Sequence, residues 1–403
     1  MNIWIVSLFD PTPKDNTRPM RYMSIARAGA ALGHHVTHIS CTFRHSTKVQ
    51  RFPETSIVDI NEGYRMVYVY SFPYKKNVSL NRILSHNRFT DNLMNMLPQL
   101  GKPDVLLIAV PPLVTADKLG HWAKKNNIPF FIDIIDPWPD VFSILFPKRV
   151  IPLLKVALVP FYNQLKRILK NASGVVAISN QYIKWAKGFG MNIPKAATFL
   201  PSIPVDEVYA RIEKLKAGNP RQQNDRLRCI YAGNLGLAYD IPCILEAARI
   251  IEAKHPGMVE FVFAGTGHYE QEIRNAASGL SCIRYCGRLD YDHLLMEYAH
   301  SDLGLAQYPA GATQSITYKF FDYLGSGLPI LNSLMTEMGT MIEDHQLGLN
   351  NNPGDAQGLA GNIERVLLDP VFLQSIKDKA IAFAFENGNN DTVYKRLIHF
   401  ITA

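Results

Sequence analysis

Cysteine is scarce in this sequence, and long apolar runs are missing. Five cysteines stand among 403 residues, an odd and sparse set that is typical of a reducing compartment rather than of a disulfide framework. The longest apolar stretches, residues 105–114 and 150–161, contain prolines and fall short of the roughly 20 residues that a membrane-spanning helix needs. Residues 3–9 are apolar without a basic leader before them, which favours a first β-strand over a signal peptide. We therefore expect a cytoplasmic chain without a transmembrane segment.

Charged side chains are modest in number but unevenly placed. Lys and Arg total 42 against 35 Asp and Glu, a net charge of +7 that is too low for a dedicated nucleic-acid-binding protein. Residues 1–200 nevertheless carry +14, and residues 201–403 carry −7. This asymmetry predicts that the first half meets an anionic partner, such as a phospholipid surface, a phosphorylated lipid or a sugar phosphate. Ordinary variation of surface charge is the alternative.

Strand-like and helix-like patterns alternate along both halves of the chain. Short apolar runs recur between amphipathic stretches, which predicts parallel sheets wrapped by helices. The runs are NIWIVSL, HVTHIS, MVYVY, DVLLIAV, PFFIDI and GVVAIS in the first half, and LRCIYAG, VEFVFAG, CIRYCG, DLGLAQY and PILNS in the second. The chain therefore reads as α/β, with one doubly wound domain in each half.

A polar stretch separates the two halves. Residues 213–228 are charged and poor in large apolar side chains, which indicates a surface connection. We predict an N-terminal domain over residues 1–201, a linker over residues 202–226 and a C-terminal domain over residues 227–385. Residues 386–403 hold a short amphipathic helix that could pack on either half, and thus cross back to the N-terminal domain.

Glycines follow two neighbouring strands of the second half, in Gly233-Asn-Leu-Gly236 and Gly265-Thr-Gly267. In open α/β sheets, ligands bind outside the carboxyl ends of the strands. Glycines there let backbone N–H groups approach a phosphate, and a helix N-terminus adds positive partial charge. Tight packing turns are the alternative reading of the same glycines.

A third segment, residues 314–329, is the most distinctive in the chain. If a helix starts near Thr317, Lys319 and Asp322 are three residues apart and share one face. A cation and a carboxylate would then point into one site. A solvated ion pair is the simpler alternative.

Taken together, the segments GNLG, FAGTG, YCGRLDYDHL and YKFFDYLGSGLPI resemble the donor half of GT-B glycosyltransferases of family 4. The first half is similar to bacterial surface-polysaccharide members of that family. Its landmarks are the helix that contains Arg21 and ends at Gly33, Pro111-Pro-Leu113, residues 136–140, Ala177-Ile-Ser179 and Leu200-Pro201.

The resemblance implies two Rossmann-like doubly wound domains facing across a cleft, the GT-B fold. It implies a retaining, metal-independent transferase without a cofactor, of hexosyl or N-acetylhexosaminyl type. The C-terminal domain would bind a nucleotide-diphosphate sugar, expected to be UDP-linked. The N-terminal domain would bind a lipid-linked or saccharide acceptor in bacterial surface polysaccharide biosynthesis.

The resemblance also assigns residues to the donor. Asp322 takes the position whose carboxylate receives the ribose hydroxyls. Lys319 is the candidate for stabilising the diphosphate leaving group, which gains negative charge in the transition state, and Arg18 or Arg21 would reach it across the cleft. The expected donor-binding set is Gly233, Asn234, Gly236, Gly265, Gly267, Arg288, Gln314, Ser315, Thr317 and Asp322.

Two departures from the family pattern leave other functions open. The usual signature has two glutamates eight positions apart, where this sequence has Gln314 and Asp322. Many members also carry a basic pair after the first strand of the C-terminal domain, whereas residues 234–240 of this sequence contain no Lys or Arg. A non-catalytic partner subunit that binds nucleotide sugar, or a nucleotide-sugar epimerase on the same scaffold, are the alternatives. Asp290 and Asp292 have the spacing of a metal-binding pair but stand where a helix begins, so capping is the favoured interpretation.

On the acceptor side, Asp136 follows a predicted strand. The family often places a polar residue there, facing the reacting centre, and a carboxylate could accept the proton of the acceptor hydroxyl. Trp138 would shape the sugar site. Capping of the following turn by Asp136 is the alternative.

The stretch from Phe146 to Lys170 is basic, free of acidic residues and rich in Leu, Val and Phe. This composition suits a segment lying in an anionic membrane interface. It predicts a peripheral position on the inner face of the cell membrane. A core helix with a basic outer face is the alternative.

Overall fold

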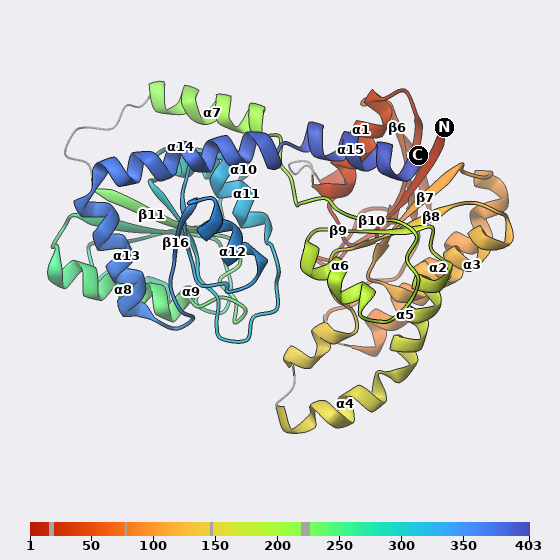
Figure 1. Cartoon of the computed structure of the whole chain (residues 1–403), viewed down its shortest axis with the longest axis horizontal. Coiled ribbons are helices and arrows are strands. Elements are labelled where there is room, and N and C mark those ends of the chain that lie inside the picture. Colours follow the sequence, from red (N-terminus) through yellow and green to blue (C-terminus); the bar gives the residue numbers. More distant parts are fainter. Residues whose placement is uncertain (16–19, 77–78, 146–147, 219–225) are drawn as a thin grey trace. The chain divides into compact units, whose positions relative to one another are not determined.

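The computed structural model describes residues 1–15, 20–76, 79–145, 148–218 and 226–403. The chain forms two compact units (Figure 1). The first unit consists of Met1–Leu200 together with Asp391–Ala403, and the second of Pro201–Asn390.

An eight-stranded sheet runs through the first unit in the order β10-β9-β8-β7-β1-β2-β6-β5. All neighbours are parallel except β5 and β6. The order reverses between β1 and β7, which makes their carboxyl ends the topological switch point. The strands are β1 (Asn2–Val6), β2 (His35–Cys41), β5 (Ser56–Ile60), β6 (Tyr64–Val69), β7 (Val105–Val110), β8 (Phe130–Ile134), β9 (Gly174–Ala177) and β10 (Ala196–Thr198). A separate small ladder joins β3 (Phe43–Arg44) to β4 (Val49–Gln50).

Helices cover both faces of this sheet. One core cluster joins the sheet to α2 (Leu80–Leu100), α3 (Leu113–Lys125), α5 (Val159–Asn171) and α6 (Asn180–Lys187). The other joins it to α1 (Arg21–Ala31) and α15 (Asn390–Thr402). Strands such as β7 are buried along their whole length, which is why they read as continuous apolar runs. Short 3-10 turns, η1 (Pro13–Asp15), η2 (Asp140–Leu145) and η3 (Lys148–Val150), and α4 (Ile151–Ala157) complete the unit.

The second unit contains a six-stranded, fully parallel sheet in the order β13-β12-β11-β14-β15-β16. This is the strand order of a dinucleotide-binding Rossmann domain, with its switch point between β11 and β14. The strands are β11 (Leu227–Ala232), β12 (Val259–Ala264), β13 (Ile283–Gly287), β14 (Leu303–Ala306), β15 (Ile330–Asn332) and β16 (Gly348–Asn350).

Local sequence signals set the helix starts in the second unit. Asp240, Asp355 and Asp369 each accept a hydrogen bond from the backbone N–H three residues later, at 3.1, 2.8 and 2.9 Å, as N-cap residues do. The helices are α7 (Val205–Gly218), α8 (Ile241–Lys254), α9 (Glu270–Gly279), α10 (Tyr291–Ala299), α11 (Tyr318–Gly325), α12 (Glu337–Asp344), α13 (Ala356–Leu368) and α14 (Pro370–Asn387).

The structure differs from the expected linker over residues 202–226. Helix α7 occupies residues 205–218, and its Val205, Val208 and Ile212 are buried, packed within the second unit. These apolar residues recur at helical spacing among charged neighbours, so composition alone masked an amphipathic helix. The rest of the expected linker, residues 219–225, lies outside the described residues.

Helix α15 completes the core of the first unit. Its Val393, Tyr394, Leu397 and Ile398 are buried against residues of α1 and the sheet. The two chain segments that join the units lie side by side, because Ile203 pairs with Asn389 as a parallel bridge. The N–H of Ile203 donates to the carbonyl of Gly388 at 3.0 Å, and the N–H of Asn390 donates to the carbonyl of Ile203 at 2.9 Å.

A fully buried ion pair lies at the centre of the first unit. Arg21 of α1 donates from Nε and Nη2 to the Asp133 carboxylate of β8, at 2.7 and 2.9 Å, and both side chains have zero solvent exposure. Nη1 donates to the carbonyl of Phe199 at 2.8 Å, and the guanidinium lies 5.6 Å from the ring centroid of Tyr394. One side chain thus joins α1, β8, the end of β10 and α15.

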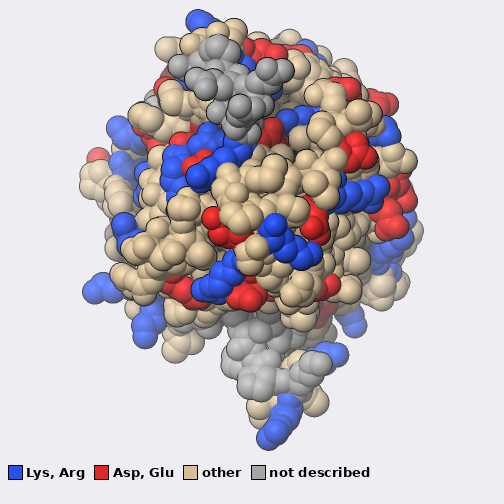
Figure 2. Space-filling view, turned by 90° about the vertical axis from the view of Figure 1, so that its left-hand side faces the viewer, with Lys and Arg blue, Asp and Glu red and all other residues tan. Residues whose placement is uncertain are grey.

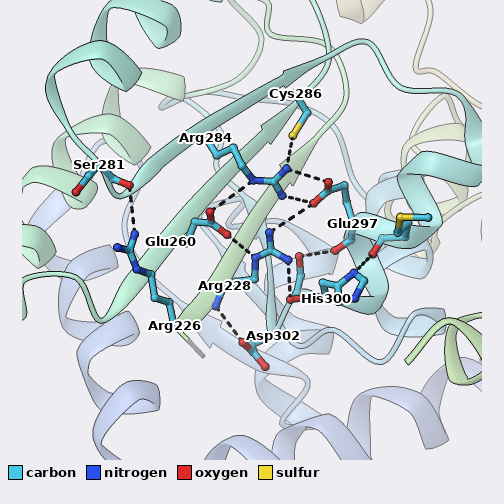
Figure 3. A network of polar contacts seen from close by, with 11 residues as sticks. Arg226, Arg228, Glu260, Ser281, Arg284, Cys286, Glu297, His300 and Asp302 are labelled. Atoms are coloured by element: carbon cyan, nitrogen blue, oxygen red, sulfur yellow. Dashed lines mark hydrogen bonds and ion pairs between the residues drawn. The ribbon is translucent and has the colours of Figure 1, made fainter. Parts of the chain in front are cut away.

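A second polar network lies at the amino ends of strands β11–β13 (Figure 3). The Arg228 guanidinium contacts Glu260, and Arg284 donates to Glu297 of α10 at 3.0 Å. Arg284 also lies 3.5 Å from Glu260. Positive and negative groups alternate in this network, so its charges balance internally. It lies at the end of the sheet away from the carboxyl ends where ligands bind, and we assign it a structural role.

None of the helices in the described part of the chain is long and apolar enough to cross a membrane.

Replacing Arg21 with Met should destabilise the protein strongly, because Asp133 would remain buried and charged without its partner. We expect Arg21→Met to lower the free energy of unfolding by about 3–5 kcal/mol. Arg27→Gln is a matched control on the same helix. Arg27 pairs with Glu62 while about 37% exposed, and a surface pair contributes about 0–1 kcal/mol. Equal costs for the two variants in urea denaturation would contradict this role for Arg21.

Candidate active site

A cavity of about 550 Å³ opens in the second unit at the carboxyl ends of β11, β12 and β13. Its remaining wall is the first turns of α11 together with residues of the β13–α10 connection and α10. The position agrees with the rule that ligands bind near the switch point of a doubly wound sheet. The lining residues are Ala232, Gly233, Asn234, Ala264, Gly265, Thr266, Arg288, Leu289, Leu294, Tyr298, Tyr318, Lys319 and Asp322.

Glycine is required where the β11 and β12 loops meet. A Cβ on Gly265 would lie 1.8 Å from the carbonyl oxygen of Gly233, and one on Gly233 would lie 2.6 Å from Lys319 Nζ. Both glycines have positive φ, 144° and 137°, which side chains disfavour. These glycines therefore bring two backbones together at the cavity.

The sequence suggested that the amides of these glycines approach a phosphate, but in the structure both amides are bonded to backbone carbonyls. The N–H of Gly233 donates to the carbonyl of Ala264 at 2.8 Å, and that of Gly265 donates to the carbonyl of Gly287 at 2.7 Å. Helix α8 begins only at Ile241, where Asp240 caps it. The tight-packing alternative thus accounts for the amides of Gly233 and Gly265. A phosphate in this cavity must be held by side chains and other backbone groups.

Lys319 supplies one positive group. It lies in the first turn of α11, and its Nζ is 4.2 Å from the ring centroid of Tyr239 and 5.1 Å from that of Tyr231. Burial lowers the pKa of Lys319 to about 8, and the Asp322 carboxylate acts in the opposite direction. The ammonium is thus held against aromatic faces, which attract cations, at the edge of the cavity.

Asp322 and Arg288 complete the charged groups of the cavity. Asp322 is half-buried on α11, three residues after Lys319, so the expected shared face is present. Arg288 follows β13 and is exposed. Within the described residues, its guanidinium has no hydrogen bond or ion pair, which leaves it available to an anionic ligand.

The cavity lining includes Gly233, Asn234, Gly265, Arg288, Lys319 and Asp322 from the expected donor and catalytic sets. The other expected donor residues, Gly236, Gly267, Gln314, Ser315 and Thr317, do not line it.

Local packing explains four of these five positions. A Cβ on Gly267 would lie 2.6 Å from the backbone of Leu235, and one on Gly236 would lie 2.9 Å from Asn234 Oδ1. Ser315 is fully buried, and Thr317 is the N-cap residue of α11 and accepts a hydrogen bond from the Tyr308 hydroxyl at 3.1 Å.

Gln314 differs from these structural positions. Its side-chain oxygen is buried and has no hydrogen-bond partner among the described residues. An unsatisfied buried polar atom is costly, so this oxygen is a candidate for contact with a ligand.

Sequence patterns did not single out the aromatic residues of the site. Tyr298 and Tyr318 line the cavity, and Tyr231 and Tyr239 contact Lys319. Tyr231 lies in β11, within a run that reads as ordinary core. Lys319 can approach this ring because Gly233 has no Cβ, which would lie 2.6 Å from Lys319 Nζ. Tyr318 alone among these four could have been inferred from the sequence, because it is adjacent to Lys319.

The Asp290 interpretation is confirmed. Asp290 is the N-cap residue of α10 and accepts a hydrogen bond from the N–H of His293 at 2.9 Å. Asp292 pairs with Arg211 of α7 at 2.5 Å.

The first unit places Asp136 and Trp138 directly after β8. The N–H of Trp138 donates to the Asp136 backbone carbonyl at 2.9 Å, so the turn is closed by backbone groups. The Asp136 side chain is exposed, yet desolvation by surrounding protein raises its pKa to about 6, while Arg82 acts in the opposite direction. A carboxyl group with this pKa could accept a proton near neutral pH.

Arg21 is not available as a cross-cleft ligand. Its guanidinium is fully buried and bonded to Asp133 and Phe199, which corrects the expectation from the sequence. The local sequence around a basic residue at the start of a helix does not indicate whether that residue pairs with a buried acid in the folded protein. Arg18 lies outside the described residues.

Asp10 is a further candidate in the first unit that the sequence patterns left unnoticed. It follows β1, next to the switch point. Burial raises the pKa of Asp10 to about 7, and the charge of Arg21 acts in the opposite direction. Its Oδ2 atom is buried without a hydrogen-bond partner among the described residues. Its place after the first strand was the signal that could have identified it.

Residues 226–369 match a family model described as glycosyl transferases group 1. The whole cavity lies within this segment. No curated protein sequence matches the chain.

Solved structures are similar over the whole length of the chain. Sucrose-phosphate synthase from Thermosynechococcus elongatus is 13% identical with a TM-score of 0.72, over 99% of this chain and 97% of that one. HepE from Anabaena, in complex with UDP, is 14% identical with a TM-score of 0.70, over 100% of both chains. WaaG, a glycosyltransferase involved in lipopolysaccharide biosynthesis, is 13% identical with a TM-score of 0.67, over 100% of both chains.

These similarities establish the fold. The chain has the GT-B glycosyltransferase fold, built from two Rossmann-like α/β domains. The fold class predicted from the sequence is confirmed.

Proposed function

We propose that this protein is a retaining, metal-independent glycosyltransferase of family 4. It moves a hexosyl or N-acetylhexosaminyl group from a UDP-linked donor to a lipid-linked or saccharide acceptor in bacterial surface polysaccharide biosynthesis. The observation that carries the proposal is the cavity of the second unit, where Lys319, Arg288 and Asp322 converge. The group 1 family model over residues 226–369 supports it, and so does the solved complex of the similar HepE with UDP.

The charges of the cavity suit a nucleoside diphosphate. As the glycosidic bond breaks, negative charge grows on the diphosphate oxygens, and fixed positive groups lower the barrier. Lys319 and Arg288 would supply these groups in place of the basic pair that residues 234–240 lack. Asp322 would accept hydrogen bonds from the ribose hydroxyls, which a carboxylate does well. Gln314, with its unsatisfied oxygen, would contact the sugar.

The first unit would bind the acceptor. In this proposal the Asp136 carboxylate accepts the proton of the attacking hydroxyl, or stabilises positive charge on the sugar. The aromatic ring of Trp138, next to it in the same turn, provides a face for a sugar ring.

A membrane surface is the proposed location of the acceptor. Helix α4 buries none of its residues, and Leu153 and Val156 are 74% and 69% exposed. Arg149 and Lys155 are exposed beside them. In Figure 2, the lower tip of the molecule carries Lys and Arg without visible Asp or Glu, whereas both signs are interspersed over the rest of the face. Exposed apolar groups flanked by cations are suited to an anionic membrane interface.

Helix α5 fits the alternative reading of the same stretch. It buries Leu165, Ile168 and Leu169 and presents basic residues outward. The membrane proposal therefore concerns α4 and its flanks, with α5 as its anchor in the first unit.

A non-catalytic partner subunit is the second candidate. The neutral Gln314 in the place of a signature glutamate favours it. Such a subunit would bind UDP-sugar in the same cavity but release no UDP.

Lys319→Gln and Asp322→Ala should each weaken UDP binding by about tenfold or more, because each removes a group that contacts the ligand. Affinity in the wild type should fall as the pH rises through about 8, where free Lys319 loses its proton, and Lys319→Gln should remove this dependence. Isothermal titration calorimetry measures both effects. Lys214→Gln, an exposed lysine of α7, is the control. Unchanged UDP affinity in both site variants would exclude the cavity as the donor site.

Asp136→Asn should lower turnover by about 10²–10⁴-fold, the usual contribution of a general base, with UDP affinity unchanged. The wild-type rate should also fall below about pH 6, where the Asp136 carboxyl gains a proton, and this limb should be absent from the variant. The measured quantity is UDP release from the sugar nucleotide, with a lipid extract as the acceptor source. Asp91→Asn, which alters a surface pair with Lys118, is the control. Wild-type rates in Asp136→Asn would refute this role.

Replacing Leu153 and Val156 of α4 with Ser should reduce co-sedimentation with vesicles that contain anionic lipid, because apolar area that would enter the interface is lost. Leu368→Ser with Val371→Ser is a matched control in the second unit, where both side chains are similarly exposed, 65% and 81%. Equal pelleting of the α4 variant and the wild type would end the membrane proposal for α4.

A further inference from the structure

The first unit contains a group of basic and aromatic side chains that the proposed mechanism does not use. They come from the loop after β1, from the β3–β4 connection, from the loop after β6 and from α2. We call them the basic–aromatic cluster, and its members are Phe9, His45, Lys48, Tyr74, Arg82 and His86.

Ring stacking and hydrogen bonds hold the cluster together. The Phe9 ring lies 5.2 Å from both the His45 and His86 rings. Tyr74 shares a hydrogen bond of 2.5 Å with His45 Nδ1.

The cations of the cluster lie over the aromatic faces. Arg82 is 5.1 Å from the centroid of Phe9 and 5.2 Å from that of Trp138. Lys48 Nζ is 4.7 Å from the centroid of Tyr74 and 3.4 Å from His45 Nδ1. The backbone of Lys48 has a φ of 60°, which a residue with a side chain adopts only at a cost. Trp138 links the cluster to the turn that carries Asp136.

Burial and the neighbouring positive charges lower the pKa values of the basic groups in the cluster. Burial lowers the pKa of His45 to about 4, and the charges of Arg82 and Lys48 lower it further. Burial likewise lowers the pKa of His86 to about 3, with Arg82 and His45 adding to the effect. Burial also lowers the pKa of Lys48, with Arg82 contributing. The Asp136 carboxylate raises the pKa of Arg82, so this acidic group faces the cations of the cluster.

One buried atom of the cluster is unsatisfied. His86 is only 5% exposed, and its Nε2 has no hydrogen-bond partner among the described residues. A buried polar atom without a partner costs about 1–3 kcal/mol. It lies in the cluster that contains the cations Arg82 and Lys48, so a bound anion would accept its hydrogen bond and interact favourably with both cations.

We propose that the basic–aromatic cluster binds a phosphate group of the acceptor substrate. Arg82 and Lys48 supply the positive charge, and the His86 ring donates a hydrogen bond from Nε2. A guanidinium and an ammonium group together suit the oxygens of a phosphate dianion. The Trp138 ring lies next to Arg82 and so next to this phosphate, where it can contact an acceptor sugar attached to the phosphate. The inference deepens the proposed function by assigning the chemistry of the acceptor, and it rests on that function.

The test uses inorganic pyrophosphate as the probe and the full chain saturated with UDP, so that the cavity of the second unit is occupied. Isothermal titration calorimetry should show pyrophosphate binding in the wild type. Arg82→Gln and Lys48→Gln should each weaken it by tenfold or more. Arg88→Gln, an exposed arginine of the same helix α2, should bind pyrophosphate as the wild type does. Equal affinity in all four proteins, or no binding in the wild type, would overturn the proposal.

A second readout guards against misfolded variants. In the wild type, pyrophosphate should shift the ring C–H resonances of His45 and His86, assigned through His45→Gln and His86→Gln. Shifts confined to other histidines would overturn the proposal even if both cationic variants fail to fold. The Lys319→Gln variant separates this inference from the proposed function. Loss of UDP binding there, with pyrophosphate binding intact, identifies two independent sites.

Two sources of phosphate are distinguished by further probes. Farnesyl diphosphate binding more tightly than pyrophosphate supports a lipid diphosphate as the ligand. Tighter binding of a hexose 6-phosphate supports a soluble sugar phosphate. If neither compound responds to Arg82→Gln, the phosphate does not belong to an acceptor, and the proposal fails.

Discussion

The bidentate pair between Arg21 and Asp133 is the interaction on which the first unit depends. Removing two charges from water costs several kcal/mol for each ion, and only close geometry with full hydrogen bonding offsets that cost. Arg21 meets the requirement through Asp133 and the Phe199 carbonyl. Asp133 stands three residues before Asp136, so the same pair fixes the carboxyl end of β8. The turn with the proposed acceptor carboxylate is thereby held in place by an interaction that never contacts solvent.

The charged groups at the two ends of the second sheet have different surroundings. At the amino ends, Arg228, Glu260 and Arg284 form a network whose charges compensate one another (Figure 3). At the carboxyl ends, Lys319 rests on tyrosine faces instead of a closed set of acids. The first set is satisfied internally and contributes rigidity. In the second, the Lys319 ammonium contacts aromatic faces, which leaves its charge available to the proposed diphosphate ligand.

Sequence patterns predicted the fold well and part of the lining of the candidate cavity. All eleven apolar runs form strands, because strands buried on both faces leave an unmistakable apolar signature. Short strands such as β10 and β16, with three residues each, leave no such signature. Lys319 and Asp322 were predictable from spacing on one helix. The burial of Arg21 was not, since its partner Asp133 is distant in sequence. The contact of Tyr239 with Lys319 likewise depends on how loops fold back, which periodicity does not encode.

Helix α15 has a consequence for the order in which the protein is made. Residues 201–390 are inserted between the two parts of the first unit, so a ribosome completes the second unit before it supplies α15. Until then, the core cluster that α15 shares with α1 and the sheet lacks part of its packing. Because a chain emerges at about 5–20 residues per second, this interval lasts roughly ten seconds or more. The nascent first unit therefore passes through a stage with exposed apolar surface, a natural point for chaperone binding.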